Sequence, residues 1–345
     1  MSKVRWGIIG PGSIANNFAD ALMSCYSGEL KGIASRSEDR LNNFGNKYNV
    51  NESFRFSNYD DLLNSEDIDA VYISTPHTFH ADLTIKAAGK GKHILCEKPT
   101  AVNFKEGQRV IEAVQQAGVF YKEGFMYRCH PQIPGLIKLI KEKKIGKIQR
   151  IISSFGFDMG KTVPESRLSQ KELAGGAILD VGLYPVSFSR MIAGLANGKN
   201  FINPKNVTGN AKIGETGVDE ISHGILEFEN DIIAEVSTAI RENMINNAVI
   251  VGSEGKIELD QPWDPGKDGG PYHSTIKIMK NGKTESIDFK GSEHLFFFEA
   301  ELSSQTIIKQ NLQVPYPGMT WEDTLGNLKT LDQWRHAAGY SLAQD

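Results

Sequence analysis

The chain has 345 residues, a length that suits about two domains, and its 38 Lys+Arg and 42 Asp+Glu residues give a net charge of −4. This balance offers no long-range attraction to nucleic acid or anionic lipid, so we expect a small-molecule partner instead. Three widely spaced cysteines, Cys25, Cys96 and Cys129, fit neither a disulfide framework nor a Cys-x-x-Cys metal site. The sequence shows no membrane-length apolar run and no signal-peptide core, which predicts a cytoplasmic protein.

Short apolar strands and amphipathic helices alternate over the first part of the chain. Continuous apolar strands separated by helical stretches such as Phe104–Ala117 indicate βαβ units, whose parallel sheet is buried on both faces. Residues 1–125 are therefore predicted to form a doubly wound, Rossmann-type α/β domain that binds a dinucleotide. The predicted strands are Val4–Ile9, Leu30–Ala34, Ala70–Ser74, His93–Cys96 and Val119–Lys122.

After about residue 126, strands follow one another with turn residues between them, and a helical stretch over 179–193 interrupts the series early. The series runs from Ile148–Phe157 to Thr275–Ile278 and is typical of an antiparallel or mixed sheet. Two helical stretches, Phe297–Ile308 and Trp321–His336, end the chain. We expect residues 126–345 to form an α+β domain with an open, mostly antiparallel sheet, and the closing helices to pack on either domain.

A glycine-rich turn follows the first predicted strand directly. Gly10-Pro11-Gly12-Ser13-Ile14-Ala15 matches G-x-G-x-x-A and opens onto a helical stretch. Gly10 permits the tight turn, Gly12 lets a pyrophosphate approach the backbone, and Ala15 allows close packing of helix and strand. Because a helix N-terminus attracts negative charge, the turn, with Ser13 and Ile14, is predicted to bind the pyrophosphate.

The end of the second strand should select between NAD and NADP. An acidic residue here would bind the ribose 2′-hydroxyl of NAD, but the sequence reads Ser35-Arg36. The Arg36 guanidinium matches a 2′-phosphate, and Arg40 lies one helical turn further on, so Ser35, Arg36 and Arg40 favour NADP. The alternative is that Arg36 packs only on the adenine face while Glu38 and Asp39 exclude the phosphate.

Two motifs from opposite halves of the chain carry candidate catalytic residues. Glu97-Lys98-Pro99 ends a predicted strand at the carboxyl edge of the sheet, where a cis bond before Pro99 would fix the lysine over the ligand cleft. In a predicted helix over 179–193, Asp180 and Tyr184 share one face. An ammonium beside the phenol would lower the pKa of Tyr184 towards working pH. The alternative is structural, with Tyr184 as a packing residue and Asp180 as a helix cap.

Together these motifs resemble the glucose–fructose oxidoreductase, inositol dehydrogenase and rhizopine catabolism (Gfo/Idh/MocA) family. The resemblance covers nearly the whole chain. Its remaining motifs are Ser74-Thr75-Pro76 with His80, the segment from Glu123 to Arg128, the Gly-Gly-Ala…Asp-x-Gly-x-Tyr segment and the stretch 319–324. It implies hydride transfer between NAD(P) and a hydroxyl or carbonyl carbon. Tyr184, where many members carry His, is similar to the branch of dimeric dihydrodiol dehydrogenases and NADP-dependent xylose dehydrogenases.

The resemblance also implies roles for single residues. Lys98 would lie near the reacting oxygen, Tyr184 would donate or accept the proton, and Asp180 would hold the substrate. His77 stands where Asn is common in the family. Besides the glycine-rich turn and the arginines after the second strand, the residues expected around the cofactor are Ser74, Thr75, His77, His80, Glu97 and Lys98. Candidate apolar walls of the substrate pocket are Phe125, Phe155, Phe157 and Met159; at strand spacing such residues belong to the core more often.

The sequence therefore predicts an NADP-preferring oxidoreductase acting on the hydroxyl-bearing carbon of a sugar or cyclic diol, with Tyr184 as general acid/base assisted by Lys98. The alternative is a non-catalytic NAD(P)-binding regulator of the same fold, which would not need Lys98 together with Asp180 and Tyr184. A homodimer or homotetramer formed through the C-terminal sheet is implied as well. No metal, nucleic acid or membrane partner is expected.

Overall fold

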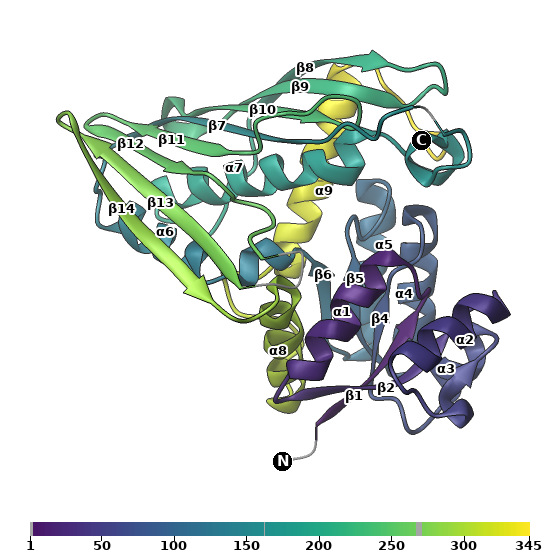
Figure 1. Ribbon diagram of the computed structural model, residues 1–345. Helices are drawn as coiled ribbons and strands as arrows, with labels where there is room; N and C mark the ends of the chain where they lie inside the picture. Colours follow the sequence, from purple (N-terminus) through teal and green to yellow (C-terminus); the bar gives the residue numbers. More distant parts are fainter. Residues whose placement is uncertain (1–2, 162, 267–270) are drawn as a thin grey trace.

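A six-stranded parallel sheet organises the N-terminal part of the protein (Figure 1), in a computed structural model that describes residues 3–161, 163–266 and 271–345. The strand order is β3-β2-β1-β4-β5-β6, and each neighbouring pair is parallel. This order reverses between β1 and β4, and ligands of such sheets bind at the carboxyl ends of the strands beside that point. The strands are β1 Val4–Ile9, β2 Gly28–Ala34, β3 Arg55–Phe56, β4 Ala70–Ile73, β5 His93–Glu97 and β6 Tyr121–Gly124, and the helices are α1 Ser13–Ser24, α2 Glu38–Lys47, α3 Tyr59–Asn64, α4 His80–Gly89 and α5 Phe104–Ala117.

The apolar runs explain why this sheet is buried on both faces. All four residues of β4, Ala-Val-Tyr-Ile, are buried, because helices cover the sheet on either side. The predicted doubly wound parallel fold is thereby confirmed. Strand β3 was not predicted, since two residues carry no readable periodicity.

An eight-stranded sheet forms the C-terminal part, with the order β14-β13-β12-β11-β7-β10-β9-β8. Only the β7–β10 pair is parallel, which confirms the predicted mostly antiparallel sheet. Strand β14 was not predicted, because its largely exposed, charge-rich sequence lacks an apolar face. The strands are β7 Ile148–Gly156, β8 Asn206–Ile213, β9 Asp219–Glu227, β10 Ile233–Ala239, β11 Ala248–Gly252, β12 Gly255–Leu259, β13 Tyr272–Lys280 and β14 Lys283–Gly291.

Helices α6 (Gln132–Lys141), α7 (Leu183–Ala196) and α9 (Trp321–Ala337) lie on one side of this sheet (Figure 1). The stretch Lys171–Ala196, which includes α7, is long and apolar enough to cross a membrane by composition. However, 94% of its apolar window is buried inside the protein, as expected for a core helix.

Both closing helices return to the N-terminal part. Helix α8 (Leu295–Ile308) packs against α1, and the indole Nε1 of Trp6 donates to Ser304 Oγ at 3.0 Å. Helix α9 runs between the two sheets, so that Leu328 packs in the core beside α5 while Trp334 packs against β8 and β9.

Buried ion pairs hold α8 and α9 in place. The Asp323 carboxylate at the start of α9 accepts from Arg128 Nη2 at 2.9 Å and from Arg190 Nη1 at 2.6 Å, and all three side chains are fully or almost fully buried. Lys122 of β6 pairs in the same way with Glu299 of α8. Breaking such a pair from one side costs about 3–5 kcal/mol, so the Lys122–Glu299 pair ties the two parts firmly together.

Candidate active site

The glycine-rich turn lies at the carboxyl end of β1, as predicted. Gly10 has a positive φ of 84°, and a Cβ there would come within 2.9 Å of Thr75 Cγ2. A Cβ on Gly12 would meet only the Gly10 carbonyl oxygen at 3.9 Å, so the turn is open above Gly12. Within the described chain no side chain caps the N-terminus of α1, and its first turn holds no acidic residue. The N–H groups of Ser13 and Ile14 are thus available to an anion.

The end of β4 faces this turn and contains one unsatisfied polar atom. Ser74 Oγ donates to the backbone carbonyl of Gly10 at 3.0 Å, which ties the two loops together. The hydroxyl oxygen of Thr75 is buried and, among the described residues, has no hydrogen-bond partner. A buried hydroxyl without a partner costs free energy, and a bound amide or ribose group would satisfy it. The residues of this edge therefore fit a dinucleotide.

Arg36 lies at the end of β2 beside two aromatic rings. Its guanidinium carbon is 5.9 Å from the ring centroid of Tyr59 and 5.6 Å from that of Phe79. Both Arg36 and Arg40 are exposed, and neither forms an ion pair within the described residues. The buried Ser35 hydroxyl instead accepts from the backbone N–H of Ser37 at 3.1 Å. This arrangement leaves the arginine charges free and provides aromatic surface next to them.

The three candidate catalytic residues come together where the two parts meet. Lys98 Nζ donates to the backbone carbonyl of Asp180 at 2.7 Å and lies 3.6 Å from its carboxylate Oδ1. The same ammonium is 5.5 Å from the ring centroid of Tyr184. The Lys98–Pro99 bond is cis, as the sequence suggested.

The prediction that the ammonium lowers the pKa of the Tyr184 phenol is wrong. Its pKa is raised well above the ordinary value, because burial and the carboxylates of Glu97 and Asp180 outweigh the ammonium. Lys98 contacts the ring rather than the hydroxyl, and the hydroxyl donates to the Met126 sulfur at 3.2 Å. Tyr184 therefore keeps its proton at neutral pH.

Asp180 lies in a turn of π-helix rather than in the continuous α-helix that we predicted. The π-turn covers Ile178–Gly182, and α7 begins only at Leu183. Asp219 at the start of β9 holds it, since its Oδ2 accepts from the N–H of Ile178 at 2.8 Å. Gly176 has φ of 109°, and a Cβ there would lie 2.0 Å from Asp219 Oδ1, which explains the glycine in this motif.

Arg167 also belongs to this group of side chains, although no sequence motif predicted it. Its Nη2 donates to Asp180 Oδ1 at 2.9 Å, and its Nη1 lies 3.2 Å from His77 Nε2. His77, expected beside the cofactor, is buried and also contacts the Ala174 carbonyl through Nδ1 at 3.3 Å. The loop that carries Arg167 has no periodic pattern, so nothing in its sequence singles the residue out.

The other two residues assigned to the cofactor edge make internal contacts. Both ring nitrogens of His80 lie 2.7 Å from carbonyl oxygens, of Pro99 and of Thr75. Burial lowers the pKa of His80 to about 4, so the ring is neutral at pH 7 and donates to one carbonyl at a time. The buried Glu97 carboxylate accepts from the Tyr72 hydroxyl, and burial raises its pKa to about 7.

The candidate apolar walls divide into two groups. Phe125 and Phe155 pack against Tyr184, with ring centroids 5.4 and 5.2 Å away. Phe157 and Met159 pack against a small cluster of Ala177, Val218 and Ile240, and Phe157 also packs against the main core that contains Tyr184. Trp263, from a proline-flanked loop that the sequence did not single out, completes the aromatic surroundings of Tyr184 at 6.1 Å.

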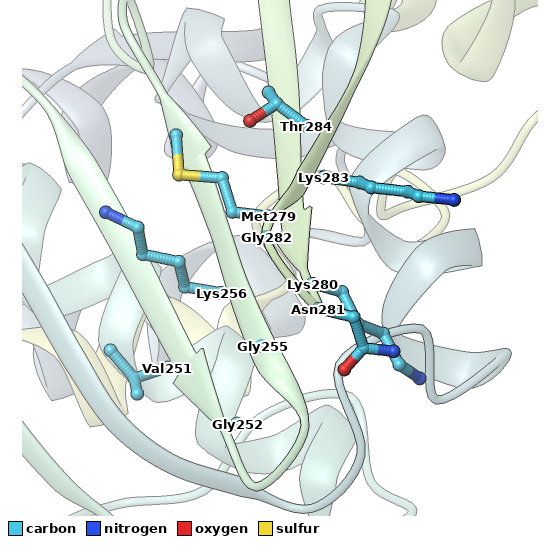
Figure 2. A pocket seen from close by; sticks show the side chains of 10 residues that line it. All are labelled: Val251, Gly252, Gly255, Lys256, Met279, Lys280, Asn281, Gly282, Lys283 and Thr284. Carbon is cyan, nitrogen blue, oxygen red and sulfur yellow. The ribbon is translucent and has the colours of Figure 1, made fainter.

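A hollow of about 490 Å³ lies on the surface between the β11–β12 and β13–β14 hairpins. Figure 2 shows that its lysine side chains, Lys256, Lys280 and Lys283, point in different directions. Lys280 and Lys256 are paired with Glu254 and Glu258. The hollow contains none of the candidate site residues described above.

Comparison with protein families assigns both parts of the chain to one family. Residues 4–125 match the oxidoreductase family with an NAD-binding Rossmann fold, and residues 136–258 match the GFO/IDH/MocA C-terminal domain. A trans-1,2-dihydrobenzene-1,2-diol dehydrogenase of Xenopus tropicalis is 33% identical to this chain, covering 82% of this chain and 81% of the relative. The chain belongs to the Gfo/Idh/MocA oxidoreductase family, and its first domain binds NAD(P).

Two other relatives extend over almost the full length. The scyllo-inositol 2-dehydrogenase (NADP(+)) IolU of Bacillus subtilis is 27% identical, with 99% of each chain covered. The crystal structure of KijD10, a 3-ketoreductase from Actinomadura kijaniata in complex with NADP, is similar with a TM-score of 0.80 and 25% identity, covering 97% of this chain and 98% of its own.

Proposed function

We propose that this protein is an NADP-preferring dehydrogenase or reductase that acts on the CH–OH group of a sugar or cyclic diol. The observation that carries the proposal is the convergence of Lys98, Asp180 and Tyr184 beside an open dinucleotide turn. The names of the relatives, a diol dehydrogenase and an NADP-dependent inositol dehydrogenase, support this substrate class. We take residues 1–125 as the cofactor domain and 126–345 as the substrate domain.

The turn from Gly10 to Ile14 would hold the pyrophosphate. The buried hydroxyl of Thr75 would form a hydrogen bond with the nicotinamide half of the cofactor. A bound nicotinamide supplies or accepts the hydride. Glu97 and Lys98 border the same edge at the end of β5. The uncharged His77 and His80 support the edge from inside the protein, since their ring nitrogens contact backbone carbonyls and Arg167.

Tyr184 would move the proton that accompanies the hydride. Its raised pKa keeps the phenol protonated, which favours proton donation to a carbonyl oxygen and hence the reduction direction at neutral pH. In the oxidation direction the phenol must accept a proton, so oxidation should accelerate as pH rises. Lys98 would stabilise negative charge on the reacting oxygen.

Arg36 and Arg40 support the preference for NADP over NAD. Both are exposed and unpaired within the described residues, and a 2′-phosphate would offer them charge-assisted hydrogen bonds. The rings of Tyr59 and Phe79 beside Arg36 provide a surface for the adenine.

A homodimer formed through the eight-stranded sheet is part of the same proposal. The sheet face opposite the helices carries exposed isoleucines on neighbouring strands, Ile225 on β9 and Ile233 on β10, next to the Arg150–Glu235 ion pair. A second copy would cover these apolar side chains. The three free cysteines are in keeping with work in the reducing cytosol.

The test is turnover with a panel of aldoses, inositols and cyclic diols, followed through NADPH absorbance at 340 nm in both directions. We expect activity that falls about 10²- to 10⁴-fold in Tyr184→Phe, because the proton donor is lost while the ring packing stays. Binding of NADPH without turnover of any member of the panel would favour the regulator instead. Full activity in Tyr184→Phe would refute the assignment of the proton donor.

A further inference from the structure

The buried carboxylate of Asp180 is held by an arginine of the second-domain loop as well as by Lys98. We propose that Arg167, itself held by His77, is a positioning residue that fixes Asp180 and thereby the ammonium of Lys98. The expected effect of Arg167 on catalysis rests on the proposed function. The contacts of Arg167 follow from the geometry alone.

Three cationic or imidazole nitrogens approach the same oxygen, Asp180 Oδ1. Arg167 Nη2 is closest at 2.9 Å, Lys98 Nζ lies at 3.6 Å and His77 Nε2 at 3.9 Å. The short bond of Lys98 runs instead to the backbone carbonyl of Asp180, at 2.7 Å. Arg167 is therefore the nearest partner of the carboxylate. The Lys98 ammonium keeps a position set by its hydrogen bond to the backbone carbonyl.

His77 orients Arg167 without adding charge. A guanidinium only donates hydrogen bonds, so His77 Nε2 must accept from Arg167 Nη1, and Nδ1 must carry the hydrogen that it donates to the Ala174 carbonyl. Burial, together with the nearby Arg167, lowers the pKa of His77 well below its usual value, which keeps this neutral tautomer. The imidazole thus links the end of β4 to both Arg167 and Ala174 of the loop.

The charges explain what the arrangement provides. Asp180 is only 5% exposed and cannot rely on water, so it needs a cation. With both Arg167 and Lys98 present, the cluster has one more positive than negative charge, which favours negative charge on a reacting oxygen. Without Arg167, Lys98 would be drawn to Oδ1 and neutralised there, away from the backbone carbonyl.

The first experiment compares Arg167→Gln with wild type, using Arg109→Gln as the matched control because Arg109 forms an exposed pair with Asp82 on α4. In Arg167→Gln we expect kcat to fall about 10- to 100-fold while the Kd of NADPH stays within about twofold. Arg167→Lys should recover part of the loss, since it keeps the charge but not the planar fork. Arg109→Gln should match wild type.

The pH profile provides a readout that loss of packing alone would not move. The pKa of Asp180 is held well below its usual value by Lys98, Arg167 and His77, the charged and titratable groups that face it. Removing one cation raises that pKa, so the acidic limb of kcat should move to higher pH in Arg167→Gln. His77→Leu, which loses the acceptor, should lie between wild type and Arg167→Gln, whereas His77→Gln, which keeps an acceptor oxygen, should shift the limb less than His77→Leu.

Hydrogen exchange of peptides covering 163–177 tests the contacts without turnover. We expect faster exchange in Arg167→Gln and His77→Leu than in wild type or Arg109→Gln. If wild type turns over no substrate but the exchange difference is seen, the proposed function fails while the Arg167 contact stands. The inference would be overturned if Arg167→Gln had the same kcat, the same acidic limb and the same exchange rate as wild type. Should that variant not fold, the same wild-type values in both Arg167→Lys and His77→Leu would overturn it.

Discussion

The polar groups of the glycine-rich turn and those around Asp180 are satisfied in opposite ways. The turn after β1 has an uncapped helix N-terminus, and the hydroxyl of Thr75 beside it has no partner among the described residues. Around Asp180 the charged groups are already paired, through Arg167, Lys98 and a short bond to the backbone. The first region is built to receive a ligand, whereas the second is preorganised by the protein itself.

The largest effect should come from the preorganised region. Lys98→Met removes the ammonium beside Asp180 and Tyr184, and we expect kcat to fall by about 10³-fold or more. Because the turn and Arg36 are untouched, the Kd of NADPH should change by no more than a few fold. Steady-state kinetics and a fluorescence titration with NADPH separate the two. Lys86→Met, which removes an exposed lysine paired with Asp60, is the control.

Substitutions at Gly10 and Gly12 separate the effect of the glycine-rich turn on stability from its effect on cofactor binding. Gly12→Ala has space for its Cβ, so the free energy of unfolding should change by less than about 0.5 kcal/mol, while the Kd of NADPH rises about 10-fold or more as the methyl meets the pyrophosphate. Gly10→Ala must adopt a φ of 84° against Thr75, and should also cost about 1–3 kcal/mol of stability. Equal effects of both variants on thermal unfolding would argue against this distinction.

Arg36 tests whether the open region reads the 2′-phosphate. Arg36→Ala should weaken NADPH binding about 10-fold, the value of one charge-assisted hydrogen bond, and leave NADH nearly unchanged. The measurement is a titration of both cofactors against tryptophan fluorescence. A variant that loses affinity for NADPH and NADH alike would show that Arg36 contacts only the adenine.

A smaller effect is expected from Asp219, whose carboxylate accepts a hydrogen bond from the start of the π-turn. Asp219 is held by N–H and hydroxyl groups without a cation, and burial raises its pKa to about 7. A raised carboxyl pKa means that the folded state holds a proton which the unfolded state loses above about pH 4, so stability falls as pH rises towards 7. Asp219→Asn lacks this cost. Its free energy of unfolding relative to wild type should rise by roughly 1–3 kcal/mol between pH 5 and pH 8, measured by urea denaturation.

The sequence predicts the open region far better than the preorganised one. The turn at Gly10 and the strands around it follow from local patterns, and the structure places them accordingly. Lys98, Asp180 and Tyr184 could be named because their motifs are local as well. Arg167 and the raised pKa of Tyr184 depend on side chains that meet only after the loop and both sheets have folded. No spacing along the chain encodes such contacts.

A crystal structure with NADP and a substrate from the panel would show whether Lys98, Asp180 and Tyr184 form a ready-made reaction centre beside an open cofactor site. In that structure we expect Lys98 to keep its hydrogen bond to the Asp180 carbonyl and Arg167 its bond to the carboxylate, while the Tyr184 hydroxyl leaves Met126 for the substrate oxygen. A substrate bound away from Tyr184, or a Lys98 side chain turned out of the cleft, would contradict this expectation.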